Sequence, residues 1–386
     1  MTKFDATRVE RARACMHATF PFGMEEEYFL VDAQTKLVAP DVSRGFFDAA
    51  SAATGGRISQ EFLQPQIEVK SSPHVNMADA RSELRELRRI VSAVAAEHGL
   101  AILAAATHPT AIWGTALQTV KKRYDQVMHD LQMIGQRDLL CGLHVHVELP
   151  DPDERVDVMY RMLPYLPLLL SLSTSSPFWQ GRRTGLKGYR LAAYDELPRS
   201  GVPELFRTRE EFDAYVAALV GAGVIEDSSF IWWAIRPSLV NPTLELRAPD
   251  TCTLVEDSLA IAALYRTLAR HLCVNRWRNA DLDAVQRALV VENKWRAQRY
   301  GVNGTFVTND GAVSVLEMLD RVIDDTKPDA AALDCAAELE RCRAIAGSGT
   351  SADAQLAVFE AHGGDGAPRE TAFRAVAEWI SAATLQ

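Results

Sequence analysis

Two regimes of hydrophobic patterning follow one another along the chain. Between about residues 20 and 250, short runs in which apolar and polar side chains alternate are separated by segments with helical spacing. Alternation with a period of two is typical of β-strands that bury one face. The pattern predicts strands over residues 23–32, 62–70, 100–107, 141–149, 230–237 and 243–249.

Helical periodicity predicts the remaining elements. In the first regime it covers residues 78–98, 150–175 and 210–222, and Gly99 is well placed to end the first of these helices. After residue 250 the pattern is one of Ala-rich amphipathic helices, predicted over residues 257–277, 281–300, 313–325, 330–345, 352–361 and 369–382. We therefore expect a single α+β unit spanning residues 1–386, with a sheet-rich part at about 20–250 and a helical part at about 251–386.

Composition narrows the class of protein. The chain has 386 residues, of which 48% are apolar, so it can bury a large core. The net charge of −10 disfavours non-specific binding to nucleic acid. The six cysteines lack C-x-x-C spacing and are expected to be reduced thiols. The N-terminus lacks the apolar region of a signal peptide, and the most apolar stretch, residues 163–172, is too short to span a bilayer. We expect a cytoplasmic protein without nucleic-acid or membrane partners.

The first predicted strand, GMEEEYFLVD, carries three consecutive acids. Its period of two places Glu25 and Glu27 on one face, roughly 6–7 Å apart, and Glu26 on the other. Two carboxylates on one buried face repel each other unless a cation lies between them. The alternative is an exposed edge strand, and for this run alone the two interpretations are equally good.

Other strands repeat the pattern of charged or imidazole side chains on one face. Glu68 shares a face with Gln64 and Gln66, whereas His144 and His146 share one with Glu148. H-x-H on a strand projects both imidazoles to one side, a common metal-ligand spacing, although a strand pair of histidines taken alone is more often structural. Several carboxylates with an imidazole suit Mg²⁺ or Mn²⁺ better than a closed zinc site.

Two arginines can complement these acids. Arg247 shares a strand face with Glu245, and Arg236 lies on the preceding strand. A guanidinium can bind phosphate through two hydrogen bonds. Neither a G-x-x-x-x-G-K-[ST] nor a G-x-G-x-x-G segment occurs. A site in which acids hold a metal and arginines bind a polyphosphate does not require a glycine-rich loop.

Six segments together resemble one known family. GMEEEYFLVD, QPQIEVKSSPH, THPT, CGLHVHVELP, RPSLVNPTLELRAPDTCT and ENKWRAQRYG, in this order and spacing, resemble the glutamate–cysteine ligase type 2 family of carboxylate–amine ligases over about residues 20–380. The resemblance implies one such domain with a glutamine-synthetase-like fold. In that fold a curved antiparallel sheet holds the active site on its concave face, and helices cover the convex face. It also implies ATP, Mg²⁺ and a homodimer.

The resemblance implies roles for individual residues. The metal ligands would be Glu25, Glu27, Glu68, His144 and Glu245. The nucleotide would be bound by Arg236, Arg247, His146, Asn293, Arg296 and Arg299. Gln64 and Arg190 are substrate candidates, with Arg190 for the α-carboxylate, while Glu27, Glu68 and Arg247 would act most directly in catalysis. Two of these roles have plain alternatives: Arg190 can be a surface loop cation, and Glu292–Arg296 an ordinary i,i+4 pair. His74, His108 and Trp113 are further pocket candidates.

The expected activity is ATP-dependent ligation of glutamate to cysteine through a γ-glutamyl phosphate. Two departures bear on the amine: Glu148 replaces the glycine of many relatives, and the loop RPSLVNPT differs from their usual form. Three alternatives stay open. The same chemistry can act on another amine or acid, a metal-dependent amidohydrolase would need no ATP, and a non-catalytic regulatory module would only bind nucleotide.

Overall fold

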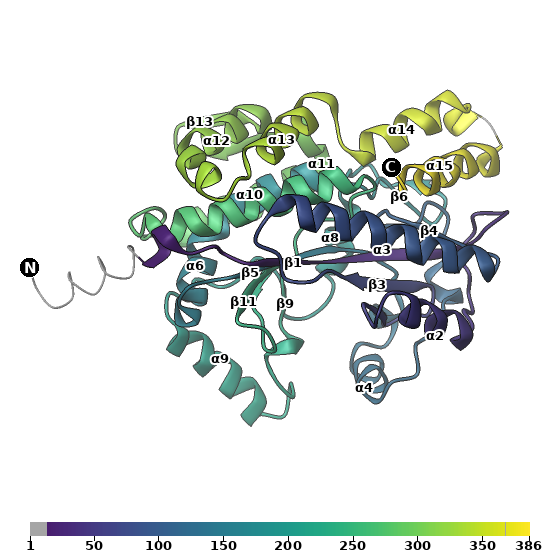
Figure 1. Cartoon of the computed structure of the whole chain (residues 1–386), viewed down its shortest axis with the longest axis horizontal. Helices are drawn as coiled ribbons and strands as arrows, with labels where there is room; N and C mark the ends of the chain where they lie inside the picture. Colours follow the sequence, from purple (N-terminus) through teal and green to yellow (C-terminus); the bar gives the residue numbers. More distant parts are fainter. Residues whose placement is uncertain (1–13, 367) are drawn as a thin grey trace, which may run out of the picture.

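The computed structural model describes residues 14–366 and 368–386. Within these residues, seven strands form one antiparallel sheet in the order β10-β11-β5-β1-β3-β2, and β4 pairs with the C-terminal half of β1 (Figure 1). The strands are β1 (Phe22–Asp32), β2 (Ile58–Gln60), β3 (Gln66–Lys70), β4 (Leu100–Leu103), β5 (Leu143–Glu148), β10 (Ile235–Pro237) and β11 (Thr243–Leu246).

Each predicted strand segment contains a strand, but most are shorter than predicted. The segment 62–70 enters the sheet only at Gln66, because the chain turns just before it and the Gln66 N–H donates to the Leu63 carbonyl at 3.1 Å. The segment 230–237 is divided in two. Its first part, β9 (Trp232–Trp233), leaves the main sheet and pairs with β8 (Ser200–Gly201).

The two faces of the sheet have different surroundings. On β1, Tyr28 and Leu30 face an apolar cluster formed with α2 (Arg44–Ala53) and α3 (Met77–Glu97). Further along the same face, α10 (Val255–Val274) packs against α3 and β5. Figure 1 shows α3 and α10 on one side of the sheet and α4 (Lys122–Leu131) and α9 (Arg209–Gly221) on the other. The face that carries Glu25 and Glu27 is the one turned toward α4.

Glu26 lies on the helix-covered face, as the strand period predicts. Both Glu26 and Arg88 are almost fully buried, and Arg88 Nη2 contacts Glu26 Oε1 at 2.6 Å. The same guanidinium donates to the backbone carbonyls of Cys252, Thr253 and Thr384. One buried ion pair thus ties β1 and α3 to the start of α10 and to the C-terminus.

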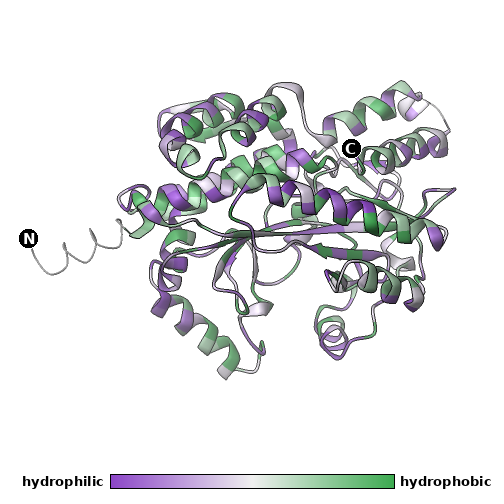
Figure 2. Ribbon diagram, viewed as in Figure 1, coloured by the Kyte–Doolittle hydropathy of each residue, from purple (hydrophilic) through white to green (hydrophobic). Residues whose placement is uncertain are grey.

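Most of the chain beyond residue 255 is helical. After α10 come α11 (Ala284–Tyr300), α12 (Val315–Ala332), α13 (Ala336–Ser348), α14 (Ser351–Ala361) and α15 (Arg369–Ala383). In Figure 2 these helices are banded in hydrophilic and hydrophobic residues, as amphipathic helices are. The periodicity did not predict the hairpin of β12 (Thr305–Thr308) and β13 (Gly311–Ser314), nor α2 and α4.

The remaining elements complete the first part of the chain. They include α5 (Met133–Gln136), α6 (Arg155–Met162), α7 (Leu166–Ser173), β6 (Phe178–Trp179), β7 (Arg182–Arg183) and α8 (Tyr189–Tyr194). The helix α3 ends at Glu97, and Gly99 follows with a φ of +70°, so the predicted glycine stop is confirmed.

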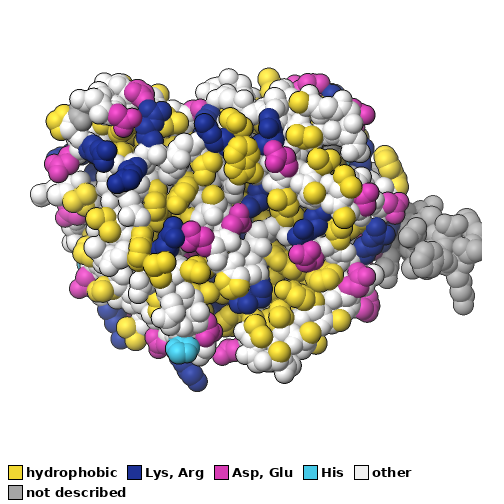
Figure 3. All heavy atoms as spheres, turned by 180° about the vertical axis from the view of Figure 1, so that it is seen from behind, with side chains coloured by type: hydrophobic (Ala, Val, Ile, Leu, Met, Phe, Trp, Pro, Cys, Tyr) yellow, Lys and Arg dark blue, Asp and Glu magenta, His cyan; other side chains and the backbone are white. Residues whose placement is uncertain are grey.

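The surface carries charged side chains of both signs. On the face shown in Figure 3, Lys and Arg side chains are interspersed with Asp and Glu. All six cysteines are free and buried. Among the described residues, no helix is both long and apolar enough to cross a membrane.

Candidate active site

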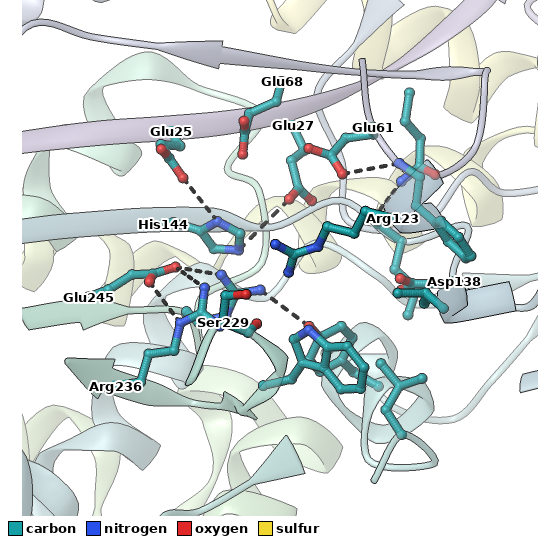
Figure 4. A pocket seen from close by; sticks show the side chains of 18 of the residues that line it. Glu25, Glu27, Glu61, Glu68, Arg123, Asp138, His144, Ser229, Arg236 and Glu245 are labelled. Carbon is teal, nitrogen blue, oxygen red and sulfur yellow. Dashed lines mark hydrogen bonds and ion pairs between the residues drawn. The ribbon is translucent and has the colours of Figure 1, made fainter. Parts of the chain in front are cut away.

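The face of the sheet that carries Glu25 and Glu27 forms the floor of a pocket of about 550 Å³ (Figure 4). The side chains that β1, β3, β5, β10 and β11 contribute to it are Glu25, Glu27, Gln66, Glu68, Lys70, His144, His146, Arg236 and Glu245. The wall opposite is formed by α4 and the segment before β5, and α8 contributes Arg190 and Tyr194. All five predicted metal ligands therefore meet in one cavity.

Strand register brings these side chains together. Glu25 pairs across the sheet with His144, Glu27 with Glu68, and Glu245 with His146. Directly opposed residues of antiparallel strands have neighbouring Cβ atoms on the same face. The His144 ring consequently lies between two acids, with Nδ1 3.6 Å from Glu25 Oε2 and Nε2 3.8 Å from Glu27 Oε1.

Three overlapping groups in the pocket have the composition of metal sites. They are Glu25–His146–Glu245, Glu25–Glu68–His144 and Glu27–Glu61–Glu68, and in each group the potential ligand atoms lie within 4.8 Å of one another. The sequence pattern did not predict Glu61 as a site residue. It precedes β3 in an irregular segment, where no strand period indicates a face. His146, predicted to contact the nucleotide, also lies among the metal-ligand candidates.

Unpaired imidazole nitrogens show that these groups fit a cation. Both ring nitrogens of His144 and Nε2 of His146 are buried and lack a hydrogen-bond partner among the described residues. Burial, reinforced by Arg247, lowers the pKa of His144 to about 3. The ring is therefore neutral at physiological pH and offers a lone pair, as a metal ligand must. Carboxylate oxygens with one or two imidazoles suit Mg²⁺ or Mn²⁺.

The acids of the pocket respond differently to their surroundings. The pKa of Glu27 is raised to about 8: burial is the largest cause, Glu68 adds to the rise, and Arg190 opposes it. Burial also raises the pKa of Glu61, and the nearby Glu68 and Glu27 add to the rise. For Glu25, burial is outweighed by His144, His146 and Lys70, which hold its pKa well below the usual range. Divalent cations would relieve the repulsion around Glu27 and Glu61.

Two arginines share one carboxylate at the end of the pocket nearest β10. Arg236 Nε donates to Glu245 Oε2 at 2.9 Å, and Arg247 Nη1 donates to Glu245 Oε1 at 2.5 Å. Burial would raise the pKa of Glu245, but Arg247 and Arg236 outweigh it and hold that pKa well below the usual range. Figure 4 shows Arg236 and Glu245 across from Glu61 and Asp138. The fixed guanidinium groups leave positive charge beside the acidic cluster, as a bound polyphosphate requires.

Arg190 is not a surface loop cation. Its side chain is 2% exposed and lines the pocket from α8. Nη1 donates to the carbonyls of Arg247 and Pro249 at 3.2 and 3.1 Å, whereas Nη2 has no hydrogen-bond partner among the described residues. Gly142 makes room for this group, because a Cβ atom there would lie 2.2 Å from Arg190 Nη2.

Several predicted site residues lie elsewhere. Gln64 is in the turn before β3 and donates to the Gln118 carbonyl at 3.2 Å. Because the strand begins only at Gln66, Gln66 lines the pocket and Gln64 does not. Asn293 and Arg296 bind the backbone of Val307 and Thr305 and hold the β12–β13 hairpin. Arg299 lies over the Tyr300 ring at 5.0 Å. The residues that line the pocket include none of these four.

The remaining loop candidates also have structural partners. His74 lies 2.5 Å from a Glu83 carboxylate oxygen, and His108 lies 2.8 Å from the Lys36 carbonyl. Trp113 belongs to a short 3-10 helix and, like both histidines, is not among the lining residues. Glu148 is exposed at the end of β5, outside the lining.

Comparison with known sequences decides the family. The sequence profile of glutamate–cysteine ligase family 2 matches residues 21–372. The chain belongs to this family. It is 56% identical over 366 residues to a protein of Bradyrhizobium sp. (strain ORS 278) that carries the provisional name glutamate–cysteine ligase 2, covering 95% of this chain and 88% of that one. A protein of Rhodospirillum rubrum with the same provisional name is 43% identical, covering 95% and 96%.

Solved structures show the fold of this glutamate–cysteine ligase family 2 member. A bifunctional glutathione synthetase from Pasteurella multocida superposes with a TM-score of 0.72 at 14% identity, covering 99% of this chain and 54% of that one. A glutamate–cysteine ligase from Francisella tularensis, solved in complex with AMP, superposes with a TM-score of 0.67 at 12% identity, covering 95% and 89%. The predicted glutamine-synthetase-like fold is confirmed, and family membership supports an ATP-dependent carboxylate–amine ligase.

Proposed function

We propose that this protein uses ATP and Mg²⁺ to join the γ-carboxylate of glutamate to an amine, with cysteine as the first candidate. The observation that carries the proposal is the set of three overlapping groups of carboxylates and imidazoles beside two half-buried arginines in one pocket. ATP and a carboxylate are both anions, and their reaction needs this combination of cation ligands and fixed positive charge. The family assignment points to the same substrates.

The reaction has two balanced steps. A carboxylate oxygen of glutamate attacks the terminal phosphorus of ATP, the bond to ADP breaks, and an acyl phosphate forms. The amine nitrogen then attacks the acyl carbon, the bond between that carbon and the phosphate oxygen breaks, and phosphate leaves while the nitrogen loses a proton. Neither step requires a nucleophile from the protein, so the site must position the reactants and neutralise charge.

Named residues match these tasks. The divalent cations would be held by the carboxylates and imidazoles of the three groups, which are Glu25, Glu27, Glu61, Glu68, His144, His146 and Glu245. Such ions, when bound, neutralise phosphate charge and polarise the transferred group. Arg247 and Arg236 are placed to bind phosphate oxygens, and Glu245 fixes both guanidinium groups in advance. Arg190 presents its free Nη2 to the pocket and suits the α-carboxylate of the acid substrate.

The competing functions fit the pocket less well. A metal-dependent amidohydrolase needs one metal-activated water and has no use for paired phosphate-binding arginines. A non-catalytic module would not be expected to keep every matching acid in one cavity. Glu148 is exposed and lies outside the pocket, which argues against a role for this residue in selecting the amine. Cytoplasmic location and a homodimer stay predictions.

The direct test is ADP release from ATP and Mg²⁺ with glutamate, with and without cysteine and a panel of other amines, coupled to identification of the product by mass spectrometry. We expect ADP release that depends on both the acid and the amine and is lost when the divalent cation is chelated. Turnover with another amine alone would keep the ligase and remove cysteine. ADP release without any amide product would contradict the proposal.

Gly142→Ala should lower the turnover number by at least about tenfold, because the added Cβ would lie 2.2 Å from Arg190 Nη2 and 3.0 Å from His144 Nε2, so that both groups must shift. A matched control is Gly221→Ala at the end of α9, where an added Cβ meets no atom within 4 Å. Initial rates and thermal midpoints of both variants check the prediction. Unchanged rates for Gly142→Ala would show that the position of Arg190 does not matter.

A further inference from the structure

One carboxylate in the pocket belongs to none of the metal-ligand groups. Asp138 lies between α5 and β5 and lines the cavity. Its carboxylate makes no hydrogen bond or ion pair with any residue that the structure describes. Figure 4 shows it on the opposite side of the pocket from Glu25 and Glu245. The acids that would hold cations therefore do not account for Asp138.

The backbone around Asp138 is held in place. Its N–H donates to the Gly135 carbonyl at 3.1 Å, Arg137 forms an ion pair with Glu196 at 2.8 Å, and Leu139 is 1% exposed. The side chain is half-buried and lines the pocket without a hydrogen-bond or ion-pair partner among the described residues. Such a group is more readily explained as one that is partnered by a ligand.

Two arginines act on Asp138 electrostatically, but neither forms an ion pair or hydrogen bond with its carboxylate in the part of the chain that the structure describes. Arg190 and Arg247 both lower the pKa of Asp138 electrostatically, but burial outweighs them and raises that pKa to about 6. The carboxylate is therefore largely ionised at pH 7. Arg190 Nη2 also lacks a hydrogen-bond partner among the described residues. A free carboxylate and a free guanidinium N–H that face one cavity complement a zwitterion, whose ammonium and carboxylate are close together.

The wall beside Asp138 has an apolar part, and Arg123 of α4 lines the pocket as well. Tyr124, Val127 and Leu131 follow helical spacing on α4 and line the pocket together with Phe62, whose ring centroid is 5.3 Å from that of Tyr124. An apolar wall excludes water and strengthens an ionic contact at its edge. It also offers a surface for the hydrocarbon part of a substrate next to the charged group.

We propose that Asp138 is a specificity residue that binds the ammonium group of an amino-acid substrate against the apolar wall of α4. This inference rests on the proposed ligase function and adds the group that recognises the substrate's positive charge. The ammonium can come from glutamate, whose α-amino group does not react, or from the incoming amine before it loses its proton. Both sources share the chemistry of a primary ammonium next to aliphatic carbon.

Asp138→Asn tests the inference, with Asp130→Asn on the exposed side of α4 as the matched control. Steady-state kinetics measure the KM of glutamate and of the amine separately, each with the other saturating. We expect one of the two KM values to rise roughly 10- to 100-fold in Asp138→Asn, because the variant loses one charge-assisted hydrogen bond to the substrate. The other KM value should change less than about twofold. The control should leave both unchanged.

Substrate pairs that differ only in the ammonium identify its source. Calorimetric binding compares glutamate with glutarate, and cysteine with 3-mercaptopropionate, in wild type and Asp138→Asn. If the ammonium is that of glutamate, wild type should prefer glutamate to glutarate and the variant should lose this preference. If it belongs to the amine, the cysteine pair should behave in this way. Unaltered preferences in both pairs would overturn the inference.

The binding measurements separate this inference from the proposed function. If wild type binds the ammonium-bearing ligands preferentially through Asp138 but forms no product with any pair, the ligase proposal fails and the recognition role stands. If product forms and Asp138→Asn changes neither a KM value nor a binding preference, the ligase stands and the recognition role is wrong.

Discussion

Glu27→Gln should lower the turnover number for ATP-dependent ligation by at least about 100-fold, because a metal-bound site contributes several kcal/mol of charge stabilisation in phosphoryl transfer. Glu27 belongs to the Glu27–Glu61–Glu68 group, and its Oε1 lies 3.8 Å from His144 Nε2. Glutamine keeps the size of the side chain and an acceptor for the Gly142 N–H, but it removes the charge. Initial rates of ADP release measure the effect.

The same variant should not lose stability. The pKa of Glu27 is raised to about 8 in the folded protein. Wild type therefore loses stability as the pH rises above the pKa of glutamate in the unfolded chain, because ionised Glu27 is less favourable in the fold than in water. This cost grows as the pH rises towards 8. At pH 8.5 with a chelator present, Glu27→Gln should therefore unfold at the same temperature as wild type or a higher one. An inactive variant with a lower thermal midpoint would indicate a structural role instead.

Glu148→Gln is the matched control for Glu27→Gln. Both residues are strand glutamates on neighbouring strands, but Glu148 is exposed and outside the pocket lining. We expect its turnover to stay within about twofold of wild type. If both variants lose activity equally, the loss in Glu27→Gln does not result from its place in the acidic cluster.

Arg88→Met should lower the free energy of unfolding by about 3–5 kcal/mol, because it leaves the buried Glu26 carboxylate without its partner. The exposed fractions of the two side chains are 1% and 0%. The substitution also removes the donor for the Cys252, Thr253 and Thr384 carbonyls. Urea titration with a spectroscopic readout measures the change, and the midpoint should fall.

Arg85→Met separates the buried pair from an ordinary surface pair. Arg85 lies about one turn before Arg88 on α3 and contacts Glu256 at 3.0 Å with exposed fractions of 52% and 33%. Exposed pairs contribute little, so we expect a loss of about 0–1 kcal/mol. Equal losses in the two arginine variants would mean that the buried pair does not hold the sheet, α3 and the C-terminus together.

The contrast between Glu26 and Glu27 shows how much the sequence contained. A strand alternates its faces whatever surrounds it, so the run EEE alone separates two candidate ligands from one core acid. The same local rule places His144 and His146 on one face. The matching motifs identified the family, the fold class and the five candidate metal ligands before any tertiary information. These conclusions depend on local backbone geometry or on characteristic sequence segments.

Strand ends and cross-strand partners needed the tertiary structure. The turn before Gln66 moves Gln64 out of the pocket, since one hydrogen-bonded turn decides where the strand period begins. Glu25 meets His144 only because of the register between β1 and β5. Asn293 and Arg296, placed at the nucleotide by their motif, bind a hairpin that the periodicity did not predict.

Two pocket residues could be found only in three dimensions. Glu61 and Asp138 lie in irregular segments, where side-chain direction follows no period, and their place depends on how α4, α5 and β3 pack. The sequence by itself determined which strand faces carry the chemistry and which family the chain resembles, because those signals are local. The tertiary structure alone decided which of these faces meet, and which loop acids join them, because such contacts are set by packing between distant segments.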